Sequence, residues 1–221
     1  MNATATQQGS GQREVIRLNA IQLFGKRGYT GTSMRDIADA VGVLPGSLYA
    51  HIESKEALLV DIVNDGIARF IDHVAPHVSA EGPPADRLRA MIVKHVEVVA
   101  DHPERSLVVF HQWRFLGPEN LPRAIERRQE YERCFVEVVE QGMADKSFDP
   151  KLNARIAVLT ILGALNWTPE WFSPDGKLSA TQVGELMAGT LLGGILNQAG
   201  LSMPHGLTAA LPSHTKTNGC F

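Results

Sequence analysis

The sequence has 221 residues, of which 44% are hydrophobic and 20% charged, a composition typical of a globular protein with a sizeable core. The net charge of −3 gives no overall attraction to nucleic acid, and no apolar run approaches the ~20 residues that a membrane-spanning helix needs. Because the first residues lack the apolar segment of a signal peptide and Cys134 and Cys220 cannot form a disulfide framework, we expect a cytoplasmic protein.

The chain is predicted to begin with a polar arm followed by a helix. Residues 1–12 are expected to be disordered. A helix is predicted from about residue 13 to residue 27, and Gly28 fits its C-cap. The apolar positions of this helix fall on one face: Ile16, Ala20, Leu23 and Phe24.

A short capped helix comes next. The stretch "TSMRD" offers Thr32 or Ser33 as an N-cap, with Asp36 as an acidic residue in the first turn. The helix is predicted over residues 34–41. Gly42 then supplies a sharp turn.

The third and fourth helices follow this turn. Pro45 suits the first turn of a third short helix, which is predicted to end near His51. Ser54 is the expected N-cap of a long fourth helix. The fourth helix carries an apolar stripe at helical spacing: Leu59, Ile62, Val63, Ile67, Phe70, Ile71 and Val74.

The remaining chain predicts further helices and no strands, so the fold class is all-α. The predicted ranges are 84–101, a segment that reaches 115, then 121–146, 152–166 and 183–196; residues 201–221 are expected to be a loose tail. The last two helices are apolar nearly all round and rich in glycine and alanine. We expect them to form a four-helix interface between two copies of the chain. A membrane hairpin is the alternative, and their charged residues and short length argue against it.

The three short N-terminal helices and their tight turn match a helix-turn-helix, in which the last helix enters the DNA major groove. The stretch "TGTSMRDIADAVGVLPGSLYAHIESKEALL" closely resembles the DNA-binding segment of the tetracycline-repressor (TetR) family of bacterial regulators. Ile52 stands where the family usually has phenylalanine. The resemblance implies an all-helical homodimer with a DNA-binding head over residues 13–56 and a ligand-binding and dimerisation body over residues 57–200.

The resemblance also assigns roles to residues of the head. Phosphate contacts are expected from five side chains: Thr32, Ser33, Tyr49, His51 and Lys55. The base-reading positions hold Leu44, Pro45, Ser47 and Ala50. Three of these four are apolar, and an apolar side chain recognises a thymine methyl group but cannot pair with guanine. Direct readout is therefore expected to be thin, with Arg35 and DNA shape contributing. The alternative is that Tyr49 and His51 are ordinary surface residues.

The body resembles a subset of the same family. The stretch "ILGALNWTPEWFSPDGKLSATQVGELMAGTLLGGI" is similar to regulators of fatty-acid, phenylacetate and sterol-ring breakdown, many of which respond to acyl-CoA thioesters. Relatives often have arginine where this chain has Glu170, and a carboxylate there repels an acidic ligand. An uncharged or cationic hydrophobic effector, sensed by a regulator of efflux or stress genes, is the alternative.

Large aromatic residues near the ends of two body helices predict a small-molecule pocket. The expected ligand-binding residues are Phe110, Trp113, Arg114, Trp167, Glu170 and Trp171. Plain core or dimer packing is the alternative for each aromatic side chain, and a solvated helix face is the alternative for Arg114. His95 lies on an apolar stripe and is expected to be a satisfied core histidine. No residue spacing suggests a metal site or a cofactor.

These features favour a transcriptional repressor that a small-molecule effector releases from palindromic operator DNA. The expected partners are double-stranded DNA, the effector and a second copy of the chain, with no membrane. An enzyme is disfavoured because the sequence has no nucleophile with a base at diagnostic spacing, no P-loop and no dinucleotide fingerprint. A helical scaffold protein is the other alternative, and operator binding that weakens with salt would separate the two.

Overall fold

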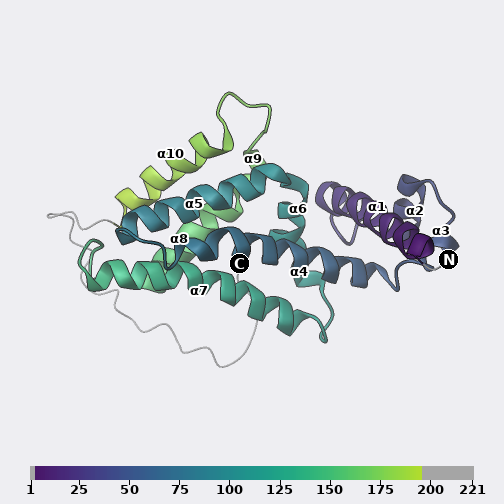
Figure 1. Ribbon diagram of the computed structural model, residues 1–221, viewed down its shortest axis with the longest axis horizontal. Helices are drawn as coiled ribbons and strands as arrows, with labels where there is room; N and C mark the ends of the chain where they lie inside the picture. Colours follow the sequence, from purple (N-terminus) through teal and green to yellow (C-terminus); the bar gives the residue numbers. More distant parts are fainter. Residues whose placement is uncertain (1–2, 196–221) are drawn as a thin grey trace.

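The computed structural model describes residues 3–195, and its regular elements are helices throughout (Figure 1). The head contains α1 (Ala3–Arg27), α2 (Met34–Val41) and α3 (Pro45–Leu48). The body contains α4 (Lys55–Val74), η1 (Ala75–His77), α5 (Pro84–Asp101), α6 (Pro103–Leu107), the π-helical η2 (Val108–Gln112), η3 (Trp113–Phe115), α7 (Leu121–Ala144), α8 (Ala154–Asn166), α9 (Thr168–Trp171) and α10 (Ala180–Gly193). The all-α prediction is confirmed.

α1 is longer than the sequence pattern indicates. It begins at Ala3, so most of the arm expected over residues 1–12 is helical. The predicted face does pack inward, since Ile16, Ala20 and Phe24 are fully buried.

Local capping signals determine α2 as predicted. Ser33 is the N-cap: its hydroxyl accepts from the Asp36 backbone N–H, and the Asp36 carboxylate accepts from the Ser33 backbone N–H, which completes a capping box. Gly42 ends the helix with φ of 79°, a left-handed conformation that glycine adopts without strain. α3 is a single turn with Pro45 at its start and ends at Leu48, earlier than expected.

α4 connects head and body (Figure 1). Its N-cap is Ser54, whose hydroxyl accepts from the Ala57 N–H at 3.0 Å, as the sequence predicts. Its N-terminal part packs on α1, and its later turns lie between α5 and α7. A displacement of this one helix therefore changes the position of the head relative to the body.

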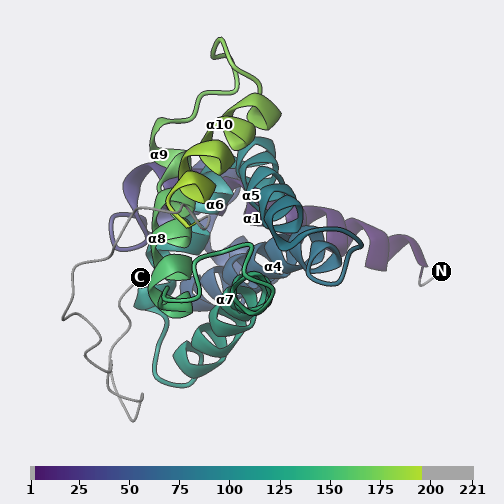
Figure 2. The ribbon, with the colours of Figure 1, turned by 90° about the vertical axis from the view of Figure 1, so that its left-hand side faces the viewer.

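α5 is the central helix of the body. Figure 2 shows α10 on one side of it and α4 and α7 on the other. α10 approaches α5 closely because Gly184 faces Val93, where an added Cβ would stand 2.8 Å from the Val93 Cα. Within residues 3–195, no helix is long and apolar enough to cross a membrane.

Two predicted helix ends shift slightly. α8 begins at Ala154, after an N-cap at Asn153, and α10 spans Ala180–Gly193 where residues 183–196 were expected. α9 is an additional short helix. The tail predicted over residues 201–221 lies outside the described residues.

Candidate nucleic-acid interface and effector site

The end of the head presents a face that nothing in the described chain covers. Leu44 is 77% exposed and Tyr49 is 58% exposed, whereas Leu48 between them is fully buried. The other exposed residues of this face are Ser33, Arg35, Pro45, Ser47 and Ala50. The predicted base-reading positions therefore lie together on the outer side of α3 and the turn after it, which leaves them accessible to a partner.

Thr32 and Lys55 face the protein itself. Thr32 is buried, and its hydroxyl donates to the Gly28 carbonyl at 2.9 Å. The Lys55 ammonium donates to the carbonyls of Tyr29 at 3.0 Å and Thr32 at 2.8 Å, and it stands 4.2 Å from the centroid of the Tyr29 ring. Their phosphate contacts stay predictions, and the observed bonds favour a bracing role for both. His51 is half-buried.

Tyr29 and the start of α4 join the head to the body. The Tyr29 N–H donates to the Gln112 side chain at 2.9 Å, and the Tyr29 ring stacks on Phe115 with centroids 6.1 Å apart. The Glu56 carboxylate accepts from the Asn120 side chain and the Gly117 N–H, both at 2.9 Å, and these bonds lower the pKa of Glu56. The segment that follows α6 is thus bound to both the head and the connecting helix.

The six predicted ligand residues do not form one cluster. Phe110 and Trp113 are buried, with Phe110 packed on Phe70 at a centroid distance of 5.0 Å. The Arg128 guanidinium lies 4.7 Å from the Trp113 ring, and that of the exposed Arg114 lies 6.0 Å away. Phe110 and Trp113 therefore pack in the core, with two arginine side chains beside Trp113, and the ligand role of this part of the set stays a prediction.

The other three form a surface group. Trp167 and Trp171 are 58% and 51% exposed. The Glu170 carboxylate lies 3.4 Å from Nε2 of His111, whose ring also contacts Trp167 edge-on at 6.3 Å. Two exposed tryptophans beside a polar pair are available to contact a ligand or a second chain.

His95 forms a buried polar pair that the sequence did not reveal. Its Nδ1 lies 2.7 Å from the Tyr131 hydroxyl, and its ring stacks on Phe110. Its other nitrogen, Nε2, is buried without a hydrogen-bond partner. Burial lowers the pKa of His95 to about 3, and the Leu165 carbonyl opposes this with a smaller effect. The ring is therefore neutral in the folded protein at physiological pH.

This pair makes stability depend on pH. The unfolded chain protonates His95 below ~pH 6.5, whereas the folded chain does not until about pH 3, so the free energy of unfolding falls as the pH drops between these values. From about pH 7.5 to about pH 5, His95 should cost the protein about 2 kcal/mol. Urea unfolding at both pH values should show that loss in the wild type and not in a His95→Phe/Tyr131→Phe double variant. An equal pH dependence in both proteins would contradict the assignment.

Ion pairs between α1 and α4 were also missed. Arg13 pairs with Asp61 at 2.6 Å, and Arg17 pairs with Asp65 at 2.9 Å. Both pairs of residues are spaced i, i+4 along their helices, so complementary charge spacing was the available signal. No group of three or more potential metal ligands occurs in residues 3–195.

A three-helix head that presents an exposed short helix, joined by one long helix to a larger helical body, defines a helix-turn-helix regulatory protein. Residues 16–62 match the family model of bacterial regulatory proteins of the tetR family, and residues 81–195 match the tetracyclin repressor-like C-terminal domain. The chain belongs to the TetR family. Proteins of this family are transcriptional regulators and not enzymes.

Named relatives cover nearly the whole chain. The HTH-type transcriptional repressor KstR2 of Mycolicibacterium smegmatis is 30% identical over 200 residues, which are 89% of this chain and 96% of that protein. The structure of the ketosteroid regulator KstR2 of Mycobacterium tuberculosis is 26% identical with a TM-score of 0.78, covering 84% of this chain and 95% of its own. The structure of AibR with isovaleryl coenzyme A and operator DNA is 29% identical with a TM-score of 0.73, covering 81% and 97%. The predicted resemblance of both head and body is confirmed.

Proposed function

We propose that this protein is a transcriptional repressor that binds a pseudo-palindromic operator as a homodimer and is released by a small effector in the bacterial cytoplasm. The exposed face of the head carries the DNA-binding part of the proposal, because a leucine that is 77% exposed has no role in packing its own chain. Two relatives support DNA binding and repression: KstR2 is a transcriptional repressor, and AibR has been crystallised with operator DNA. Two recognition helices in such a dimer would lie about 34–36 Å apart, or a multiple of that.

Exposed faces of α8 and α10 support the dimer. Ile156 and Leu186 are 46% and 61% exposed. An added Cβ on Gly163 or Gly189 would meet nothing within 4 Å, so packing among residues 3–195 does not require small residues at these two positions. Small and apolar residues at such positions allow the helices of a second copy to approach closely.

The effector we propose is an acyl-CoA or a related lipid or aromatic acid derivative. AibR was crystallised with isovaleryl coenzyme A, and the body of this chain shares its fold. Glu170 is the feature that opposes an anionic ligand. His111 lies 3.4 Å from this carboxylate, but burial lowers the pKa of His111, so its neutral ring does not balance the charge of Glu170 near pH 7. An uncharged or cationic hydrophobic effector, as in a regulator of efflux or stress genes, remains the second candidate, favoured by the exposure of Glu170.

Titrating the operator complex with acyl-CoAs of several chain lengths tests the proposal. A hundredfold loss of operator affinity requires a coupling of about 2.7 kcal/mol, so the effector must bind the DNA-free state that much better. Trp167 and Trp171 should report binding by a change in fluorescence, because both are exposed.

Trp171→Ala should raise the acyl-CoA concentration needed for release about tenfold, while operator affinity without ligand stays unchanged. Tyr49→Phe is the matched control, since it alters the head and should weaken DNA binding without changing the acyl-CoA requirement. Release by an uncharged or cationic compound, with none by any acyl-CoA, would favour the second candidate and reject the acyl-CoA.

A further inference from the structure

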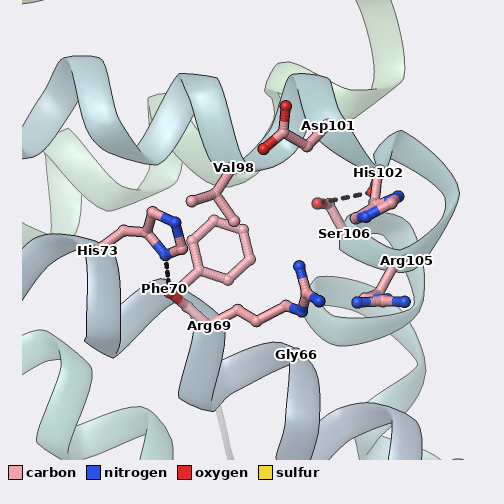
Figure 3. Close-up of a pocket in the computed structure, with 9 residues that line it drawn as sticks. All are labelled: Gly66, Arg69, Phe70, His73, Val98, Asp101, His102, Arg105 and Ser106. Carbon is pink, nitrogen blue, oxygen red and sulfur yellow. Dashed lines mark hydrogen bonds between the residues drawn. The ribbon is translucent and has the colours of Figure 1, made fainter.

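A pocket lined by two arginines lies between α4, α5 and α6, outside the predicted effector residues (Figure 3). It is a shallow pocket open to solvent, with an enclosed volume of about 10 Å³, so a bound group would sit at its mouth. The lining residues are Gly66, Arg69, Phe70, His73, Val98, Asp101, His102, Arg105 and Ser106. Figure 3 shows Arg69 extending from α4 toward the side of the pocket where Arg105, His102 and Ser106 lie.

Arg105 is the most unusual of these residues, because its cationic side chain is only 7% exposed. Its Nη1 reaches the Asp65 carboxylate at the long distance of 3.5 Å, and its Nε is buried without a hydrogen-bond partner. Burial, and then the nearby charges of Arg69 and Arg17, lower the pKa of Arg105. A buried guanidinium that has one long ion pair and an unpartnered N–H is stabilised by binding a further anion.

A single carboxylate serves three cations here. The Oδ2 atom of Asp65 lies 2.9 Å from Arg17, 3.5 Å from Arg105 and 3.8 Å from Arg69. Arg17 has a second partner in Glu14 at 2.7 Å. Arg69 and Arg105 make only long contacts with Asp65, so each guanidinium group has N–H donors that can bind another acceptor.

The formal charges around the pocket balance, because Asp101 and Asp65 match Arg69 and Arg105, so what the two guanidinium groups lack is hydrogen-bond acceptors. Burial, followed by the charges of Arg105 and Arg69, lowers the pKa of His102, so its ring is neutral near pH 7. His73 lies on the α4 side, with its Nδ1 2.7 Å from the Arg69 carbonyl. Asp101 is exposed and lies across the pocket from Arg69 (Figure 3). The Ser106 hydroxyl adds a neutral polar group.

The walls of the pocket are connected to the head. Arg17 on α1 pairs with Asp65 on α4. On the α6 side, Gly25 of α1 touches Glu104 so closely that an added Cβ would stand 3.0 Å from its Cβ. An anion that draws Arg69 and Arg105 into the pocket would leave Asp65 to pair with Arg17 alone.

We propose that this pocket is a binding site for a phosphate group, held by Arg69 and Arg105, whose occupation strengthens the Arg17–Asp65 contact between head and body. Two arginine guanidinium groups are well suited to phosphate because their N–H donors match its oxygens. The phosphate is either free or part of a larger ligand such as a coenzyme A derivative. The inference does not depend on the repressor function or on the effector proposed above.

Calorimetric titration of the full chain with inorganic phosphate, against chloride at equal ionic strength, tests the site without DNA. Phosphate should bind and chloride should not compete effectively. Arg69→Gln should weaken phosphate binding about tenfold, as expected for the loss of a charged hydrogen-bond donor. Arg89→Gln is the control, because Arg89 pairs with Glu185 away from the pocket and should leave the affinity unchanged.

Asp65→Asn separates a binding site from a structural ion cluster. Removing the competing carboxylate should tighten phosphate binding, the opposite of the effect of Arg69→Gln. Arg69 is 46% exposed, so its replacement should leave the fold intact even if an Arg105 variant does not fold. Failure of phosphate to bind above the chloride control, or weakening by Asp65→Asn, would overturn the site.

Hydrogen exchange tests the connection to the head. Phosphate should slow amide exchange in residues 13–27 of α1 in the wild type and not in Arg69→Gln; unchanged exchange with phosphate bound would reject the connection. Competition then identifies the source of the phosphate: coenzyme A should displace inorganic phosphate if it supplies the group through its 3′-phosphate, and dephospho-coenzyme A should do so less well. If neither compound displaces inorganic phosphate, the site binds free phosphate.

Discussion

Replacing Leu186 with arginine should convert the protein from a dimer to a monomer and lower its operator affinity by a factor of about a hundred or more. Leu186 is 61% exposed on α10, beside Gly189, whose Cβ position is open. In a helix-to-helix interface, an arginine at this position would bury an unpaired charge, which costs more than the interface gains there. A monomer would also lose the advantage of binding two half-sites at once.

Sedimentation at micromolar concentration and an operator titration measure the two effects. Ala144→Arg is the control, since Ala144 is exposed at the end of α7 and its replacement adds the same charge away from both faces. The control should remain a dimer. A Leu186→Arg protein that stays dimeric would show that this face of α10 is not the interface.

Replacing Lys55 with methionine should lower the free energy of unfolding by about 2 kcal/mol. The variant keeps the length of the side chain and removes the ammonium that donates to the carbonyls of Tyr29 and Thr32. Those carbonyls lie at the end of α1 and before α2, so the loss should loosen the head against α4. Operator binding should weaken as a consequence, with the salt dependence of binding unchanged.

Urea unfolding and operator titrations at several salt concentrations check this result. If Lys55 instead contacts a DNA phosphate, as the family resemblance implies, the salt slope should fall by about one unit while stability changes little. Lys151→Met is the control for stability, because Lys151 is exposed in the loop before α8. The two roles of Lys55 therefore give opposite patterns in the same pair of experiments.

The sequence by itself determined the elements of the head and most of those of the body. Ser33 with Asp36, Gly42 and Ser54 mark helix ends through bonds to residues three or four positions away, and such local bonds can be read from spacing. The TetR resemblance rests on the same stretch. The short helix α9 was missed because four residues cannot show a helical period.

Only the tertiary structure decided which side chains are available for function. It separated the expected aromatic site into a buried part at Phe110 and a surface part at Trp171, because the period of a helix indicates a face without indicating what covers it. It also brought Arg17 and Arg105 to Asp65, across 48 and 40 positions of sequence. Contacts over such distances depend on how α1, α4 and α6 pack together. That packing results from many apolar contacts at once, and the spacing of charged residues along the chain carries no information about it.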